Sequence, residues 1–278
     1  MSAARRDAVS GRECGDTTFP LRARSPRSPV VEFRVGRAVR PFVLAVHGSS
    51  LPTAAATLER LCDAVESLGG IRPVVGHLDH QAPSLAEALS EGAVVVPLLL
   101  GDGYHRTVDI PAVVAEHGTG CLLARGLSGE PAIAVALRDR LREAEERAGV
   151  RADAVVLAAA GSARPGGNDG ALVAARQLRL LLPGVPVRTA YCSAAEPSVA
   201  EAVAGLRGAG HRRVVVAAHL LAPGRFTLAL GLAGADAVGS PLADHSGVAG
   251  LVLRRYEAAA LRLGVSLSPE TTLLSEAA

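Results

Sequence analysis

Two histidines stand where a strongly apolar run gives way to glycine and polar residues. His47 follows the segment FVLAV, and His105 closes the segment PLLLGDGYH. Such a run is typical of a buried strand in a parallel α/β sheet, where ligands collect in the crevice outside the carboxyl ends of the strands. Imidazole is a common ligand of divalent transition metals, and its ordinary pKa lets it exchange protons near neutral pH. The pair therefore indicates a metal site.

The segments that must position these histidines alternate between strand and helix from residue 41 onward. We expect strands at 41–46, 72–78, 93–100 and 120–125, and helices at 53–68, 83–91, 107–117 and 130–148. In the 53–68 segment, apolar residues recur at three- and four-residue intervals with charged residues between them, which is typical of a helix that packs one face on a sheet. This order of elements predicts a doubly wound parallel sheet.

The second half repeats the order of elements. We expect strands at 153–159, 185–191, 213–221 and 235–240, and helices at 169–182, 197–208 and 246–263. The sequence AGS at 160–162 aligns with HGS at 47–49, and GRF at 224–226 aligns with GYH at 103–105. In the second copy, Ala160 and Phe226 thus stand in place of the two histidines. We expect metal chemistry in the first copy, with the second copy forming the other wall of a cleft.

These patterns predict an α/β protein of two tandem doubly wound parallel-sheet domains, related by internal duplication. The predicted divisions are an Arg/Ser/Pro-rich disordered leader at 1–40, a metal-binding domain at 41–150, a degenerate second domain at 151–265 and a tail at 266–278. We expect the hinge near 149–153.

The sequence around the histidines resembles the class II chelatases of the sirohydrochlorin type, the CbiX/SirB family. The resemblance rests on VHGS at 46–49, LD at 78–79 followed by APSLAEA at 82–88, and PLLL at 97–100 followed by GYH and by VDIP at 108–111. It continues more weakly through 153–262. The resemblance implies a chelatase-like fold and a lyase-type enzyme that inserts a divalent metal into a sirohydrochlorin-type tetrapyrrole without an organic cofactor.

The resemblance also implies roles for particular residues. His47 and His105 would be the catalytic pair, binding the metal and accepting protons. Asp79 is the candidate for a third metal ligand, at a position where relatives commonly carry Glu. Asp109 would either cap the 107–117 helix or orient an imidazole as a hydrogen-bond acceptor.

Substrate contacts are expected in the loops beside the histidines. Gly48 and Ser49 form either an ordinary strand-to-helix turn or a set of backbone amides that face a substrate carboxylate. Gly103 and Tyr104 form either a plain loop or a wall against the tetrapyrrole face. Since this substrate class carries many carboxylates, Arg106 and Arg164 are candidates for pairing with them, beside the alternative of solvated surface residues.

Other patterns exclude several classes of site. His77 and His80 have HxxH spacing, but residues three apart on a strand face opposite sides, so we expect no metal site there. The four cysteines lack CxxC spacing, which argues against a zinc ribbon or a disulfide framework. Neither HGSS nor GDGYH matches a phosphate-binding glycine loop.

Composition sets the remaining expectations. The 278 residues carry 29 basic and 27 acidic side chains, and this balance gives no general reason to expect binding to nucleic acid or to a membrane surface. No apolar stretch approaches the roughly 20 residues of a membrane span, and the N-terminus lacks the apolar region of a signal peptide. We therefore expect a cytoplasmic protein, and a monomer, because two copies in one chain can form their own cleft.

Two questions stay open from the sequence. Fe²⁺ would lead to sirohaem and Co²⁺ to the cobalamin route, and Ni²⁺ suits the same ligands. A rival interpretation is a non-catalytic metal- or tetrapyrrole-binding protein derived from the same family, since the second half lacks both histidines.

Overall fold

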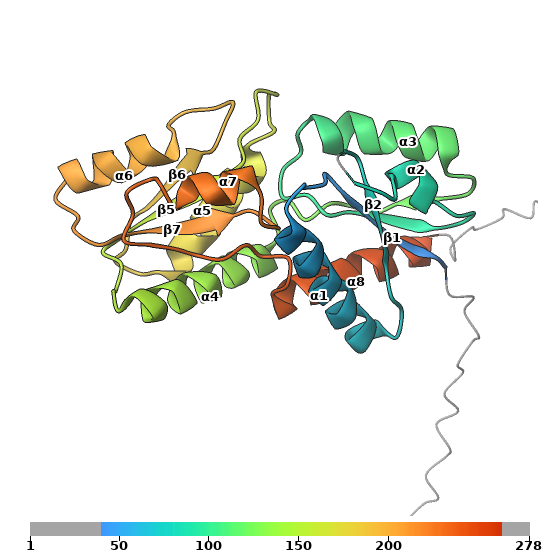
Figure 1. Cartoon of the computed structure of the whole chain (residues 1–278), viewed down its shortest axis with the longest axis horizontal. Coiled ribbons are helices and arrows are strands. Elements are labelled where there is room, and N and C mark those ends of the chain that lie inside the picture. Colours follow the sequence, from blue (N-terminus) through green and yellow to red (C-terminus); the bar gives the residue numbers. More distant parts are fainter. Residues whose placement is uncertain (1–39, 80, 263–278) are drawn as a thin grey trace, which may run out of the picture. The chain divides into compact units, whose positions relative to one another are not determined.

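The structure, a computed structural model, describes residues 40–79 and 81–262 (Figure 1). The strands are β1 (Phe42–Val46), β2 (Val74–His77), β3 (Val94–Pro97), β4 (Leu122–Leu123), β5 (Ala154–Ala159), β6 (Val187–Tyr191), β7 (Val214–His219) and β8 (Ala237–Val238). The helices are α1 (Pro52–Gly69), α2 (Leu85–Ala88), the π-helical turn η1 (His105–Asp109), α3 (Ile110–His117), α4 (Pro131–Ala148), α5 (Asp169–Leu181), α6 (Val199–Gly208), α7 (Arg225–Leu230) and α8 (Ser246–Leu261).

The strands form two four-stranded parallel sheets, ordered β2-β1-β3-β4 and β6-β5-β7-β8. The two orders correspond strand for strand, so the predicted pair of duplicated, doubly wound α/β units is confirmed. In each sheet the first strand is central, with pairing such as Leu44 to Val75 and to Val96 in the first sheet. The carboxyl ends of three neighbouring strands therefore meet at one edge of each sheet.

The faces of each sheet belong to different cores. On β1, Phe42, Leu44 and Val46 join a central cluster that also holds residues of the second sheet. Val43 and Ala45, on the opposite face, pack with Leu85 of α2 and Ile110 of α3. This alternation is the period of two that a strand imposes when both of its faces are buried.

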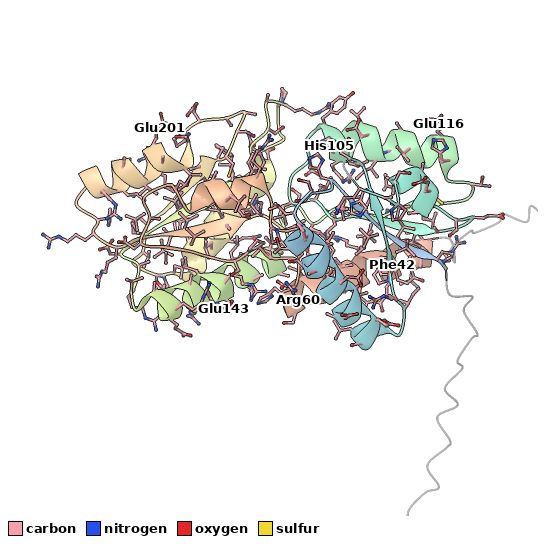
Figure 2. The ribbon with its side chains drawn as sticks, viewed as in Figure 1. Phe42, Arg60, His105, Glu116, Glu143 and Glu201 are labelled. Carbon is pink, nitrogen blue, oxygen red and sulfur yellow. The ribbon has the colours of Figure 1, made fainter. Side chains whose placement is uncertain are left out.

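The long helices are exchanged between the sheets. The helix α4 contacts α5, β7 and β8 of the second sheet, although it precedes that sheet in the chain. The helix α8 contacts α1, β3 and β4. The ring of Tyr256 in α8 stacks on Phe42 of β1 at a centroid distance of 4.3 Å, and Phe42 is labelled in Figure 2. We call β1–β4 with α1–α3 and α8 the first lobe, and β5–β8 with α4–α7 the second lobe. The predicted division near residue 150 follows the repeat in the sequence, whereas the packing crosses it.

Several element boundaries differ from the expected ones. The helix expected at 83–91 is only α2, because Leu89 adopts an extended backbone, and the strand expected at 93–100 ends at Pro97. The helix expected at 107–117 begins two residues earlier with the π-helical turn. The helix α7 lies in a segment for which the sequence predicted no element.

The described residues bear on the expectations for membrane-spanning helices and for the cysteines. Within 40–79 and 81–262 there is no helix with the length and apolarity needed to cross a membrane. Cys62, Cys121 and Cys192 are free thiols, and Cys62 is buried, as its place on the apolar face of α1 predicts. The leader and the tail lie outside the described residues.

Candidate metal centre

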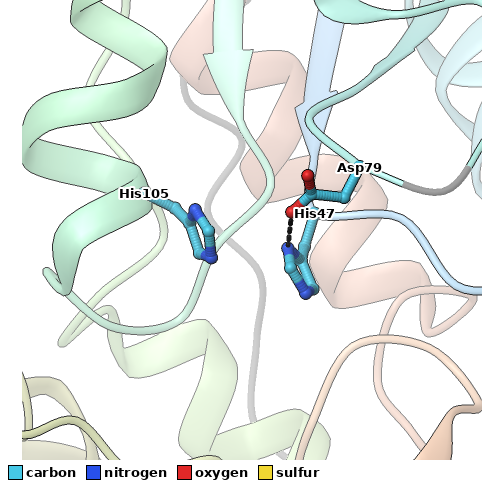
Figure 3. A group of neighbouring side chains, drawn as sticks. All are labelled: His47, Asp79 and His105. Atoms are coloured by element: carbon cyan, nitrogen blue, oxygen red, sulfur yellow. Dashed lines mark ion pairs between the residues drawn. The ribbon is translucent and has the colours of Figure 1, made fainter.

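His47, Asp79 and His105 converge at the carboxyl edge of the first sheet (Figure 3). His47 directly follows β1, Asp79 lies two residues beyond β2, and His105 opens η1 after β3. One candidate ligand atom from each of these residues lies within 4.8 Å of the others. The two imidazoles point toward one another, with ring centroids 4.6 Å apart. The geometry brings together the three residues that the sequence proposed.

The spacing of this group suits a single divalent ion. Nitrogen and oxygen ligands lie about 2.0–2.2 Å from such an ion, so pairs of them are separated by roughly 3–4 Å. Nδ1 of His47 lies 3.5 Å from Oδ2 of Asp79, within that range. All three side chains are partly exposed, so an ion can reach them from solvent.

Asp109 holds His105 in one orientation. Its Oδ2 lies 2.6 Å from Nδ1 of His105, four residues earlier across the π-helical turn. Because a carboxylate only accepts hydrogen bonds, Nδ1–H donates to it and Nε2 keeps its lone pair. Asp109 makes no side-chain cap to α3. Of its two proposed roles, the structure supports the orienting one.

A glycine turn fixes His47 beside Asp79. The backbone N–H of Asp79 donates to the carbonyl of His47 at 2.9 Å. Gly48 between them has φ +104°, and a Cβ at this position would lie 2.0 Å from the carbonyl oxygen of Asp79. Only glycine permits this close approach. The second lobe repeats the device at Gly161, with φ +92° and a Cβ position 1.8 Å from the carbonyl oxygen of Ser193.

A cavity of about 750 Å³ opens beside the histidines, lined by residues of both lobes. Its lining includes every residue predicted for substrate contact in the first copy: Gly48, Ser49, Gly103, Tyr104 and Arg106. The hydroxyl of Ser49 donates to the carbonyl of Pro223 in the second lobe at 3.1 Å. The second lobe adds Ala160 and Phe226, the residues that align with the two histidines.

The arginine candidates differ in position. Arg106 lines the cavity, and its buried Nε has no hydrogen-bond partner among the described residues. Its nearest acidic group is Asp102, at 3.8 Å. Arg164 is exposed and is not among the residues that line the cavity. A role of Arg106 toward substrate carboxylates stays a prediction.

His77 is near the metal group but is not one of its three residues. It is buried at the end of β2, burial lowers its pKa, and its Nδ1 has no hydrogen-bond partner within 40–79 and 81–262. His80 lies outside the described residues, so the HxxH spacing is not tested.

Sequence reasoning missed His219, which also lines the cavity. It is the last residue of β7 and is 4% exposed, and burial lowers its pKa to about 4. The signal was available in the repeat, since aligning AHLLAPGRF with PLLLGDGYH places His219 opposite Leu98. The second copy thus differs from the first by a histidine in place of leucine at the carboxyl end of a buried strand. A search for matching motifs does not detect such a difference.

The protein has two α/β lobes, each built on a parallel sheet, with a cavity between them. At the strand ends of one lobe, two histidines and a carboxylate form a group that could hold a metal ion. These features define the class to which the protein belongs. The CbiX family model matches residues 41–144 and 154–259, well over half of the chain, and both copies separately. The chain belongs to the CbiX family.

Individual relatives are more distant. The sirohydrochlorin cobaltochelatase of Methanopyrus kandleri is 35% identical over 80 residues, a match that takes in 26% of this chain and 56% of that protein. This chain thus spans little more than half the length of that curated relative.

The solved structures resemble the whole described fold. SirB from Bacillus subtilis with Fe³⁺ superposes with a TM-score of 0.62 at 21% identity, covering 82% of this chain and 98% of SirB. The structure of CbiX, described as the terminal enzyme of siroheme biosynthesis in denitrifying bacteria, gives a TM-score of 0.59 at 18% identity, with 79% and 99% covered. At these identities the likeness establishes the fold.

Proposed function

We propose that this protein is a sirohydrochlorin chelatase, which inserts Fe²⁺ or Co²⁺ into a sirohydrochlorin-type tetrapyrrole. The observation that carries the proposal is the convergence of His47, Asp79 and His105, two of which, His47 and His105, line a cavity between the lobes. The names of the relatives support the substrate class, because one is a sirohydrochlorin cobaltochelatase and one is SirB with Fe³⁺.

The ligand set suits transfer of a metal better than its storage. Three protein ligands leave coordination positions open, which a substrate can fill, whereas a closed four-ligand cage would retain the ion. His47, His105 and Asp79 would hold the incoming metal loosely at the cavity wall. The macrocycle nitrogens would then replace them one by one, since the ring offers four donors against three.

The cavity would hold the macrocycle against both lobes. Gly103 and Tyr104 would lie against one ring face, and Phe226 supplies an aromatic side chain from the second lobe. The backbone amides of Gly48 and Ser49 and the guanidinium of Arg106 would pair with peripheral carboxylates. Since one chain supplies both walls, we propose that the protein acts as a monomer. We also propose that it requires no organic cofactor.

The physiological metal belongs to the same proposal. Imidazole and carboxylate suit Fe²⁺, Co²⁺ and Ni²⁺ alike, so ligand type does not separate them. Fe²⁺ would place the enzyme on the route to sirohaem and Co²⁺ on the route to cobalamin.

The test is anaerobic conversion of sirohydrochlorin, followed by absorbance, with Fe²⁺, Co²⁺ and Ni²⁺ in parallel. We expect catalysed insertion with at least one metal, and a fall in kcat/KM of about 100-fold or more in His47→Ala and in His105→Ala, as for loss of a residue that acts on the reacting atoms. The matched control is His117→Ala, an exposed histidine at the end of α3, which should behave as the wild type.

The other outcomes are equally informative. A wild-type rate equal to that of the uncatalysed reaction would refute the enzyme and favour a non-catalytic metal- or tetrapyrrole-binding protein, an alternative motivated by the loss of both histidines from the second copy. Insertion that survives both substitutions would keep the activity and refute the site.

A further inference from the structure

His219 is a third histidine of the cavity, and it comes from the lobe that lacks the metal pair. It ends β7, where its backbone pairs with Ala159, directly before the position that aligns with His47. Because Val215 and Ala217 of β7 belong to the central core cluster, the period of two places His219 on that same face of the sheet. The side chain thus reaches the cavity from the second sheet.

Much of the wall of the cavity that His219 lines is apolar. The cavity residues that belong to the central core cluster are Val46, Leu58, Leu98, Leu100, Ala159 and Ala171. Within 40–79 and 81–262, no residue makes a hydrogen bond or an ion pair with the His219 ring. Burying an imidazole without a partner costs free energy, so its retention at a cavity wall calls for a role that hydrophobic packing does not supply. At the aligned position the first copy has Leu98, which shows that this fold accepts an aliphatic side chain there.

Metal insertion, the function proposed above, creates a need for such a group. A ring that accepts a divalent ion loses two N–H protons, and each leaves its electron pair on nitrogen for the new bond to the metal. His47 and His105 can accept protons only after the ring nitrogens have displaced them from the ion, because until then their lone pairs bind it. An N–H that reacts before this displacement needs an acceptor outside the metal group.

We propose that His219 is this acceptor, a catalytic base that takes the pyrrole N–H protons from the ring while the metal is held by the first lobe. Its free ring nitrogen gains the proton and becomes an imidazolium, which returns the proton to water in the cavity before the second N–H reacts. The inference rests on the proposed chelatase function.

The electrostatic setting agrees with this role. Burial keeps His219 neutral at neutral pH, so its lone pair is available before substrate binds. The other titratable or charged groups that line the cavity are His47, Tyr104, His105, Arg106 and Arg225. A substrate that carries several carboxylates would favour the imidazolium and raise the pKa of His219 toward the working pH, where a base is most effective.

The decisive variants are His219→Leu, which copies the residue of the first half, and His219→Ala, which leaves space for a small base. We expect kcat to fall by about 100-fold or more in both, with the affinity for Co²⁺ and the KM for sirohydrochlorin within about threefold of the wild type. Added imidazole should restore the rate of His219→Ala by about tenfold or more and leave His219→Leu unchanged. His117→Ala, with imidazole added, is the control.

The outcomes distinguish a failure of the chelatase function from a failure of the role proposed for His219. An inactive wild type would refute the chelatase function itself. An active wild type with unchanged kcat in His219→Leu would overturn the role of His219 alone, as would a loss of activity in His219→Ala that imidazole does not restore. Thermal melts of both variants establish that they fold, which the leucine variant should do at least as well as the wild type.

Discussion

At the scale of single residues, the sequence predicted which three side chains converge but not what holds them in place. His47 and His105 could be predicted because each follows an apolar strand whose end must lie at the same sheet edge. Their separation and the hydrogen bond from His105 to Asp109 depend on a π-helical turn, which no periodicity in the sequence announces. His219 was missed because the apolar run continues past it through Leu220 and Leu221, with no glycine or polar residue directly after the histidine.

The contact between Asp109 and His105 predicts a loss of metal affinity when the carboxylate is removed. Asp109→Ala frees the imidazole to rotate and to exchange tautomers, so affinity for Co²⁺ should fall by about 10- to 100-fold. Titration calorimetry under anaerobic conditions measures this directly.

Asp102→Ala is the matched control, since Asp102 lies in the loop before η1 and, among the described residues, pairs only with Arg106, at 3.8 Å. Equal affinities for Asp109→Ala and the wild type would contradict the orienting role. Helix stability should not change, because Asp109 makes no cap to α3.

At the scale of elements, the two copies preserve the same glycine turn although only one preserves the ligands. In both lobes, a backbone N–H from the segment after the second strand donates to the residue before the glycine, at 2.9 Å to His47 and at 3.0 Å to Ala160. The turn thus belongs to the fold of both lobes and does not depend on the histidine pair. This explains why the alignment of AGS with HGS predicted equivalent positions correctly.

Gly48→Ala should therefore damage both stability and metal binding. The added Cβ meets the carbonyl of Asp79 at a φ that other residues rarely adopt, so we expect the free energy of unfolding to fall by at least about 2 kcal/mol. Metal affinity should fall with it, because His47 and Asp79 must separate.

Gly149→Ala provides the comparison. Gly149 also has a positive φ, of +64°, but a Cβ there would meet nothing within 4 Å, so only the backbone term of about 1 kcal/mol remains. Urea unfolding curves of the two variants measure the difference. Equal losses would mean that the close approach at Gly48 carries no cost.

Prediction of the elements themselves was best where the pattern was long. The amphipathic patterns at 53–68 and 130–148 correspond to α1 and α4 within one residue at each end. Short elements were less well predicted, since α2 is a single turn ended by the extended Leu89, and α7 has only six residues. Local signals compete with tertiary contacts over such short lengths.

At the scale of the whole molecule, the exchange of α4 and α8 joins the lobes through more than the cavity. Asp244, just before α8, accepts hydrogen bonds from Arg60 of α1 at 2.9 Å and from Arg140 of α4 at 2.6 Å. Arg140 and Asp244 are largely buried, with side chains 17% and 21% exposed. This cluster connects helices from both halves of the chain, which no pattern within either half could reveal.

Removing the shared carboxylate should destabilise the protein as a whole. In Asp244→Ala, Glu143 is the one acidic partner left to Arg140 among the described residues, so the free energy of unfolding should fall by about 1–3 kcal/mol. Asp63→Ala is the control, because the ion pairs around Arg72 are exposed and such pairs contribute about 0–1 kcal/mol. Urea unfolding measures both variants. Equal losses in the free energy of unfolding would contradict the larger contribution expected from the buried ion pair.

The exchange of helices also makes the order of the halves arbitrary. The helix α4 runs through 149–153 into β5 of the lobe that it covers, and α8 returns to the lobe of β1, where the Tyr256 hydroxyl donates to the carbonyl of Arg40 at 2.8 Å. The end of α4 is thus close to β5 in the chain, and the last turns of α8 lie close to the start of β1. If the end of α8 were joined to β1, the two lobes would be connected in the same way at both junctions, a long helix leading into the first strand of the lobe that it covers. A circular permutant cut at 149–153, with the end of α8 joined to β1 by a linker of similar length, should have the same native fold.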